Sequence, residues 1–414
     1  MHLFALDPLL VGDFGWAEVG IVVLKAVFVF ALLLVAVMLM IWFERKLIAD
    51  MQHRLGPNRA GPFGLLQTLA DGTKLFFKED LIPDRADRKV FVLAPYLSLV
   101  PAFVTFSVIP IGGGFNGEKQ GTFELFGKET YMQLADPPIG VLLVLAMSSI
   151  AVYGVMLAGW SSGSKYPLLG AVRASAQMVS YEAALGLSVV AVVLLAGSLS
   201  THDIVLHQSG GGYGLFGDFG LPRWNIIATG IVPFVIFLIA GTAEANRPPF
   251  DLVEAEQELV GGFNTEYASI RFAFFYMAEF MNTVTLSAII VTLFLGGPAG
   301  PTIVGPAWLW GVVWFFLKLM VFLFTFVWFR ATLPRFRYDQ LMNLGWKVLI
   351  PLSLGWLLLL AAIRIGDDRD WEPWIVVAAS FGVLVLGWVA ITAALRVGQA
   401  RHAEEEAFDE GVVV

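Results

Sequence analysis

The stretch "VGIVVLKAVFVFALLLVAVMLMIWF", Val19–Phe43, decides the fold. It holds 25 residues and a single charged side chain, Lys25. As a helix rising 1.5 Å per residue it reaches roughly 38 Å, which exceeds the ~30 Å hydrocarbon core of a bilayer. In hydrocarbon every backbone polar group needs an internal partner, so an apolar run of this length is expected to be helical. The stretch predicts a membrane-spanning helix.

Comparable apolar runs recur along the chain. Of its 414 residues, 57% are apolar and 14% are charged, whereas soluble domains carry roughly 25% charged residues. The sequence predicts an all-α integral membrane protein with nine transmembrane helices. The predicted spans are 19–43, 90–111, 137–160, 174–197, 224–243, 267–295, 303–329, 346–363 and 373–395.

The distribution of Lys and Arg predicts the orientation of these spans. Counting those at the flanking span ends, nineteen fall on one side and five on the other, and nine of the nineteen lie in the 44–89 loop. Cytoplasmic loops are enriched in positive charge. We therefore expect the N-terminus outside, and the 44–89, 161–173, 244–266 and 330–345 loops in the cytoplasm. No cleavable signal is expected, because the first eighteen residues contain neither Lys nor Arg.

Several kinds of chemistry lack a sequence signature. Cysteine is absent, which argues against disulfides, thiolate metal sites and protein-ligated iron–sulfur clusters. The five histidines form no pair within a span that would ligate haem. No P-loop, GxGxxG turn, HExxH or serine elbow occurs, so nucleotide binding and hydrolysis are unsupported. Any redox role is expected to use a diffusible substrate or a cofactor held by a partner.

The 44–89 loop is more than a tether. The segment "RLGPNRAGPFG", residues 54–64, contains Gly-Pro twice and is not expected to be continuous helix. After it, "GLLQTLADGTKLFFKED", residues 64–80, places apolar residues among polar ones at roughly helical spacing. This pattern predicts a cytoplasmic amphipathic helix after the first span, lying along the membrane or against a partner. Asp71 and Lys74 are close enough on it to pair.

The most unusual segment is acidic. Between Glu244 and Glu266 the chain carries six carboxylates and one cation, Arg247. On a helix, Glu254 and Glu258 would share a face about 5–6 Å apart. Two ionised carboxylates at that distance repel by roughly 3 kcal/mol at an effective dielectric near 20, so the cluster is expected to hold protons at neutral pH. A solvated acidic loop is the alternative; the rigid "RPPF" and apolar "LVGGF" flanks favour a packed segment.

Charged residues inside spans and a basic segment complete the candidate groups. Glu182 and Glu279 are expected to face a polar interior, because an unpaired charge at the bilayer centre costs at least ~3 kcal/mol. Lys25 is near enough to a span end to snorkel. The segment "RATLPRFRYDQLMNLGWK", residues 330–347, carries Arg330 and Arg335 among aromatic residues. It either anchors the chain by positive charge or binds an acidic partner or a polar quinone headgroup.

Four blocks resemble one protein family. They are "ERKLIADMQHRLGPNRAGPFGLLQTLADGTKLFFKED", "GWSSGSKYPLLGAVRASAQMVSYE", "AEANRPPFDLVEAEQELVGGFNTEY" and "RATLPRFRYDQLMNLGWK". These blocks resemble the H-subunit family of proton-pumping NADH:quinone oxidoreductase, respiratory complex I. The resemblance implies a membrane-arm subunit at the mouth of a quinone tunnel, with ubiquinone or menaquinone as substrate. It places FMN and iron–sulfur clusters in partner subunits only, and no covalently bound cofactor here.

The resemblance also implies roles for particular residues. Lining residues of the quinone tunnel would be Arg45, Asp71, Lys74, Arg330 and Arg335. Proton-coupling carboxylates between quinone reduction and the pumping subunits would be Glu182, Glu244, Glu256, Glu258, Glu266 and Glu279.

The chain departs from this family at its C-terminus. The family core has eight spans, so residues 1–363 are expected to form the family domain and residues 364–414 an additional helix with an acidic tail. The nearest rival is the homologous subunit of a membrane-bound hydrogenase or another donor:quinone dehydrogenase. An ion-coupled transporter would predict broken helices in matching halves, and a purely structural anchor would leave Glu182 and Glu279 unexplained.

Overall fold

A computed structural model describes residues 7–10, 15–115, 121–209, 223–252, 260–302 and 305–369, with two isolated positions at 382 and 392. The chain divides into two compact units, Met1–Ile350 and Pro351–Val414. The described part is mostly helical, and it contains seven helices that are long and apolar enough to cross a membrane. The prediction of a multi-span helical membrane protein is therefore confirmed at this level.

The long helices follow the predicted spans. They are α1 (Trp16–Met51), α3 (Arg88–Ser107), α4 (Gly140–Ser161), α5 (Lys165–Ala196), α10 (Ser269–Phe294) and α11 (Ala307–Thr332). The seventh, Tyr338–Gly366, combines α12 (Tyr338–Leu344), a π-helical turn (Gly345–Leu349) and most of α13 (Ile350–Asp368). The predicted ninth span, 373–395, lies outside the described residues except for two positions.

The predicted span 224–243 is interrupted. It consists of α7 (Asn225–Ala228) and α8 (Ile231–Glu244). Gly230 separates them with a φ of 77°, a conformation that L side chains rarely adopt. At 1.5 Å per residue the 14 residues of α8 rise only about 21 Å, less than the hydrocarbon thickness. The predicted span is therefore not one continuous helix.

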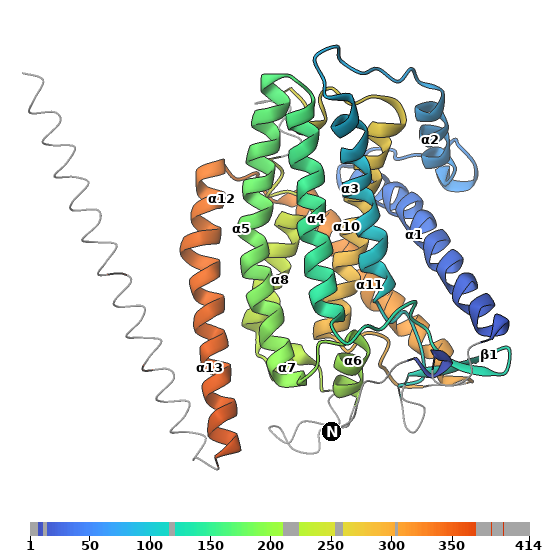
Figure 1. Cartoon of the computed structure of the whole chain (residues 1–414), viewed down its shortest axis with the longest axis vertical. Helices are drawn as coiled ribbons and strands as arrows, with labels where there is room; N and C mark the ends of the chain where they lie inside the picture. Colours follow the sequence, from blue (N-terminus) through green and yellow to red (C-terminus); the bar gives the residue numbers. More distant parts are fainter. Residues whose placement is uncertain are drawn as a thin grey trace, which may run out of the picture. The chain divides into compact units, whose positions relative to one another are not determined.

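The two ends of the first unit carry different small elements. At one end lie α6 (Thr201–Ser209), α7 and an antiparallel hairpin of β1 (Thr122–Leu125) and β2 (Lys128–Tyr131), while α2 (Gln67–Phe77) lies at the other (Figure 1). The hairpin, which the sequence patterns did not predict, turns at Phe126 and Gly127. Both residues have positive φ, as a tight hairpin turn requires.

Helix α10 forms the centre of the first unit. In the most apolar 18-residue segment of α10, 83% of the residues are buried, compared with 22% in the corresponding segment of α1. Lys318 of α11 donates hydrogen bonds of 2.8 to 2.9 Å to the carbonyls of Leu295, Gly297 and Ala299, which follow the last turn of α10. A cation at a helix C-terminus also complements the helix dipole. Lys318 therefore fixes the end of the helix that carries Glu279.

The predicted amphipathic helix exists as α2. Its apolar side chains remain exposed: Leu69 by 54%, Phe76 by 72% and Phe77 by 88%. Before it, residues 54–66 form no α-helix, as the Gly-Pro pairs predicted, and only a 3₁₀ turn (Pro62–Gly64) appears. Ser269, the first residue of α10, donates to the carbonyls of Leu75 and Lys78. This contact ties the end of α2 to the start of α10.

Candidate functional site

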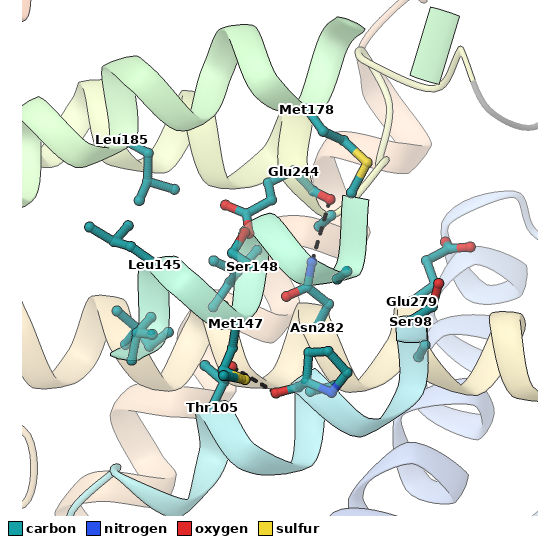
Figure 2. A pocket seen from close by; sticks show the side chains of 18 of the residues that line it. Ser98, Thr105, Leu145, Met147, Ser148, Met178, Leu185, Glu244, Glu279 and Asn282 are labelled. Carbon is teal, nitrogen blue, oxygen red and sulfur yellow. Dashed lines mark hydrogen bonds between the residues drawn. The ribbon is translucent and has the colours of Figure 1, made fainter. Parts of the chain in front are cut away.

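A cavity of about 100 Å³ lies among α3, α4, α5, α8 and α10. Its polar lining includes Glu244, Glu279, Asn282, Ser98 and Ser148 (Figure 2). The Ser98 hydroxyl is buried and has no hydrogen-bond partner among the described residues. A cavity this large has room for several waters, and its carboxylates and hydroxyls supply the partners that water needs. Glu279 therefore lines this cavity together with these polar groups, and its predicted role stays a prediction.

Two neighbouring serines of α4 hold two carboxylates from different helices. Ser148 donates a hydrogen bond to Glu244 of α8, and Ser149 donates one to Glu182 of α5. Asn282 of α10 donates to the Glu244 backbone carbonyl over 3.4 Å (Figure 2). Because the two serines are adjacent in the chain, they bring Glu182 and Glu244 into one polar cluster.

A second cluster is ionic. The Arg247 guanidinium donates to Glu44 of α1 through Nη1 at 2.9 Å, and its Nε lies 3.6 Å from Glu279. Arg330, in the last turn of α11, makes a short ion pair with the other Glu44 oxygen. The Arg247 side chain is 3% exposed and packs over the Phe280 ring at 4.5 Å. Two cations therefore compensate two carboxylates, and Glu279 belongs both to this ionic cluster and to the cavity.

The turn that carries Arg247 is held by its backbone. Gln177 of α5 donates to the carbonyls of Ala243 and Phe250, both at 2.8 Å. The Phe336 amide donates to the Pro249 carbonyl at 3.0 Å, and the Phe336 and Phe250 rings pack edge to face. These contacts confirm that this part of the acidic segment is packed. They also bring the third and fourth sequence blocks together.

The five residues expected on the quinone side lie in different places. Arg45 and Asp71 pair at 2.5 Å, with side chains 42% and 31% exposed, so Asp71 contacts Arg45 of α1 and not Lys74 on its own helix. Lys74 lies in the last turn of α2. Arg330 joins the ionic cluster. Arg335 lies between α11 and α12, and its buried Nη2 has no hydrogen-bond partner among the described residues.

The remaining acids of the loop are less defined. Glu254, Glu256 and Glu258 lie outside the described residues, so their predicted repulsion and proton sharing stay a prediction. Glu266 is half-buried just before α10. The described carboxylates that cluster are therefore Glu44, Glu182, Glu244 and Glu279.

Sequence reasoning missed Glu44 and did not assign Arg247 to the site. Glu44 directly follows an apolar run of 25 residues, and an acid at such a border needs a partner once it is buried. Arg247 is the one cation of the acidic segment, and this could have marked it as the partner. Two donors of Arg247, Nε and Nη2, are buried without a hydrogen bond within the described part of the chain.

These buried donors without hydrogen-bond partners allow us to ask whether a quinone headgroup fits the site. Arg247 and Arg335 offer buried N–H groups, and a quinone headgroup presents two carbonyl oxygens that accept hydrogen bonds. Burying a donor without an acceptor costs roughly 1–3 kcal/mol, so an acceptor, either water or a bound headgroup, is expected there. The residues present fit a polar, oxygen-bearing substrate.

Comparison with known proteins gives a consistent result. A family model described as NADH dehydrogenase matches residues 24–361. A protein of Frankia casuarinae, named as the H subunit of NADH-quinone oxidoreductase, is 52% identical over 392 residues, covering 93% of this chain and 79% of the relative. Proteins of the same name are 53% identical in Frankia alni, over 90% of this chain and 79% of the relative, and 48% identical in Streptomyces avermitilis, over 93% and 82%.

Proposed function

This chain belongs to the NADH dehydrogenase family, and we propose that it is a multi-pass membrane subunit that couples quinone reduction to proton translocation in an NADH:quinone oxidoreductase. The names of the relatives favour NADH over hydrogen as the electron source of the assembly. Electrons reach the quinone through FMN and iron–sulfur clusters of partner subunits. This chain contributes protein groups and no redox centre.

The quinone end of the site is built from Arg45, Asp71, Arg330 and Arg335, with Lys74 nearby on α2. The buried donors of Arg247 and Arg335 suit a headgroup oxygen that gains negative charge on reduction. The exposed Leu69, Phe76 and Phe77 of α2 suit an isoprenoid tail or lipid. The described contacts therefore support a path that is apolar at α2 and cationic farther in.

The observation that carries the coupling is the double contact of Arg247. One guanidinium touches Glu44, which also binds Arg330 on the quinone side, and Glu279, which lines the cavity. A charge or proton that appears at the quinone shifts the balance among these groups. At an effective dielectric near 20, unit charges 4 Å apart interact by about 4 kcal/mol, enough to change the proton occupancy of the next acid.

From Glu279 the coupling continues to Glu244 and Glu182 through the cavity and the two serines. Glu256, Glu258 and Glu266 complete the proposed series of proton-coupling carboxylates. The positive-inside bias sets the acidic loop and the 44–89 loop on the cytoplasmic side, where the peripheral subunits that donate electrons dock. Neighbouring membrane subunits receive the charge displacement.

The test is coupled turnover in the purified, intact assembly reconstituted into vesicles. NADH:quinone activity and proton uptake are measured for Glu244→Gln, Glu182→Gln and Glu256→Gln, with Glu129→Gln on the hairpin as the matched control. We expect pumping per electron to fall about tenfold or more in the first three, equivalent to at least about 1.4 kcal/mol. Assembly should survive in all four.

Two outcomes would overturn the proposal. Normal pumping in both Glu244→Gln and Glu182→Gln would remove the carboxylate series from the mechanism. Co-purification with a nickel hydrogenase in place of flavin and NADH-binding subunits would replace NADH as donor.

A further inference from the structure

The cavity extends far beyond the carboxylates. Along α10 its lining runs from Phe275 to Leu293, eighteen residues apart, which corresponds to about 27 Å of helix rise. That is close to the full ~30 Å of hydrocarbon. At the end remote from the acidic loop the lining includes Thr201, at the start of α6. By the positive-inside bias this is the outer end.

An apolar stretch of the lining separates the carboxylates from this outer end. On α4, Ser148 is followed toward the outer end by Leu145, Val144 and Val141, all of which line the cavity. Seven residues separate Ser148 from Val141, which is about 10 Å of helix rise. In Figure 2, Leu145 and Leu185 lie on one side of Glu244, and Glu279 lies on its other side. Hydrophobic constrictions in channels gate by losing their water, and we expect this apolar stretch to behave in the same way.

Beyond this apolar stretch the lining residue Thr201 is hydrogen-bonded to a buried polar side chain, Gln133. Gln133 donates to Thr201 Oγ1 at 2.9 Å and to the Val108 carbonyl at 2.7 Å. Gln133 is only 3% exposed, and its Oε1 has no hydrogen-bond partner among the described residues. A buried acceptor without a donor calls for water. This observation, independent of the cavity itself, indicates water at its outer end.

Next to this position lies a carboxylate that can exchange protons. Asp136 accepts from Ser200 Oγ at 2.8 Å. Burial raises the pKa of Asp136 to about 6, and the nearby negative charge of Asp203 adds to the rise. Around it lie His202 and Tyr131, whose rings stack at 3.9 Å, and beyond Tyr131 the ion pair of Asp7 and Lys25 at 2.9 Å.

We propose that the outer half of the cavity is a gated proton exit within this chain, which leads from Glu244 through water across the apolar Val141–Leu145 stretch to Asp136. The inference rests on the proposed function. Glu244 gives its proton to the first water, each water passes one on, and the last protonates the Asp136 carboxylate, which releases it at the outer face. No electron moves.

The dimensions suit such a transfer. A gap of about 10 Å needs three or four waters at the usual spacing of about 2.8 Å between oxygens. At 10–15 Å³ for each, the whole cavity of about 100 Å³ holds roughly seven to ten waters, more than the three or four that this stretch needs. In this proposal the apolar side chains of the Val141–Leu145 stretch keep the path dry at rest. This dry state is needed because a permanently hydrated path would dissipate the proton gradient.

The experiment measures passive proton leak in vesicles that hold the intact assembly, with a potassium diffusion potential and no NADH or quinone. A pH-sensitive dye inside the vesicles reports proton entry. Leu145→Ser adds a hydroxyl to the apolar stretch, and we expect the leak to rise about fivefold or more. Leu142→Ser, whose parent residue is 48% exposed one turn away, is the matched control and should leave the leak unchanged.

The exit is tested by a second substitution in the same background. Leu145→Ser combined with Asp136→Asn should return the leak to within about twofold of the native level, because the amide cannot take up and release a proton at neutral pH. If Leu145→Ser does not assemble, Val141→Thr has nearly the same shape and should give a smaller leak that Asp136→Asn also suppresses.

Two results would overturn the inference. One is a leak in Leu145→Ser no larger than in Leu142→Ser. The other is a leak that persists when Asp136 is replaced. Because no turnover is needed, failure here is separate from failure of the coupled pumping test on Glu244→Gln.

Discussion

Arg247→Met removes the guanidinium that joins two carboxylates of the ionic cluster. In the native site Arg247 and Arg330 face Glu44 and Glu279, so the four charges sum to zero. Methionine keeps most of the aliphatic stem and leaves the cluster with a net charge of −1. Glu44→Gln leaves it at +1. The double variant restores the balance.

The distances set the size of the effect. At 2.9 Å from Glu44 and 3.6 Å from Glu279, Arg247 attracts the two carboxylates by about 6 and about 5 kcal/mol at an effective dielectric near 20. Desolvation offsets part of this, and breaking one partner of a buried pair typically costs about 3–5 kcal/mol. If about 3 kcal/mol of this is lost from the productive geometry, quinone turnover falls about 100-fold.

The assay is kcat/KM for quinone in the purified assembly with NADH as donor, for both single variants and the double variant. We expect each single variant to lose about 100-fold and the double variant to lose about as much as the worse single, because the pair acts as a unit. Arg337→Met, on a side chain that is 80% exposed, is the control and should stay near native. Single effects that multiply in the double variant, or singles within twofold of native, would refute the reasoning.

Other outcomes follow from individual contacts. Lys318→Met should lower the temperature at which half of the NADH:quinone activity survives heating, because three backbone carbonyls lose a charged hydrogen-bond donor. Each of these bonds is worth about 1.5–3 kcal/mol. Unchanged heat resistance would contradict this. Asp71→Asn should change that temperature little, since an exposed pair contributes at most about 1 kcal/mol, yet raise the KM for quinone; an unchanged KM would remove Asp71 from the tunnel. The pKa of Asp136 rises from 3.8 to about 6 on folding, so the folded state binds the proton more tightly and loses about 2 kcal/mol of stability as pH rises from 4 to 6; Asp136→Asn should flatten this slope in heat-inactivation measurements at several pH values. Ser148→Ala should lower pumping per electron while Ser148→Thr, which keeps the hydroxyl, should not; equal pumping in both would show that this hydrogen bond to Glu244 is dispensable.

The spans were predictable because a bilayer leaves the chain little choice. A run such as Val19–Phe43 has no low-cost conformation in hydrocarbon other than a helix, whatever surrounds it. The failure at 224–243 has a local cause. Gly230 takes a left-handed conformation that glycine permits but does not require, and hydropathy carries no information on which glycines use it. The hairpin was missed because two four-residue strands give almost no period-2 signal.

The candidate site was predictable in its members more than in its contacts. Glu182 and Glu279 stood out because a carboxylate in an apolar run needs compensation. The compensating partners are distant in sequence: Glu44 lies 203 residues from Arg247 and 286 from Arg330. No periodicity relates positions so far apart. The requirement for a partner follows from elementary electrostatics, but its identity depends on the packing of α1 against α10 and α11.

The partners divide the described carboxylates into two chemical kinds. Arginine only donates hydrogen bonds, so Glu44 and Glu279 lose their best contact if they become protonated. A serine hydroxyl donates and accepts, so Glu244 and Glu182 keep a partner in either protonation state once the hydroxyl rotates. In the proposed mechanism the arginine-bound pair therefore acts as fixed charge that responds to the quinone, and the serine-bound pair carries the proton. Repulsion among crowded acids is then not required at these four positions. By moving toward Glu44 or Glu279, Arg247 alone can alter the electric field at Glu244 across the cavity. The charge-balanced double variant is therefore the decisive comparison, because it restores the net charge of the cluster without restoring the Arg247 guanidinium.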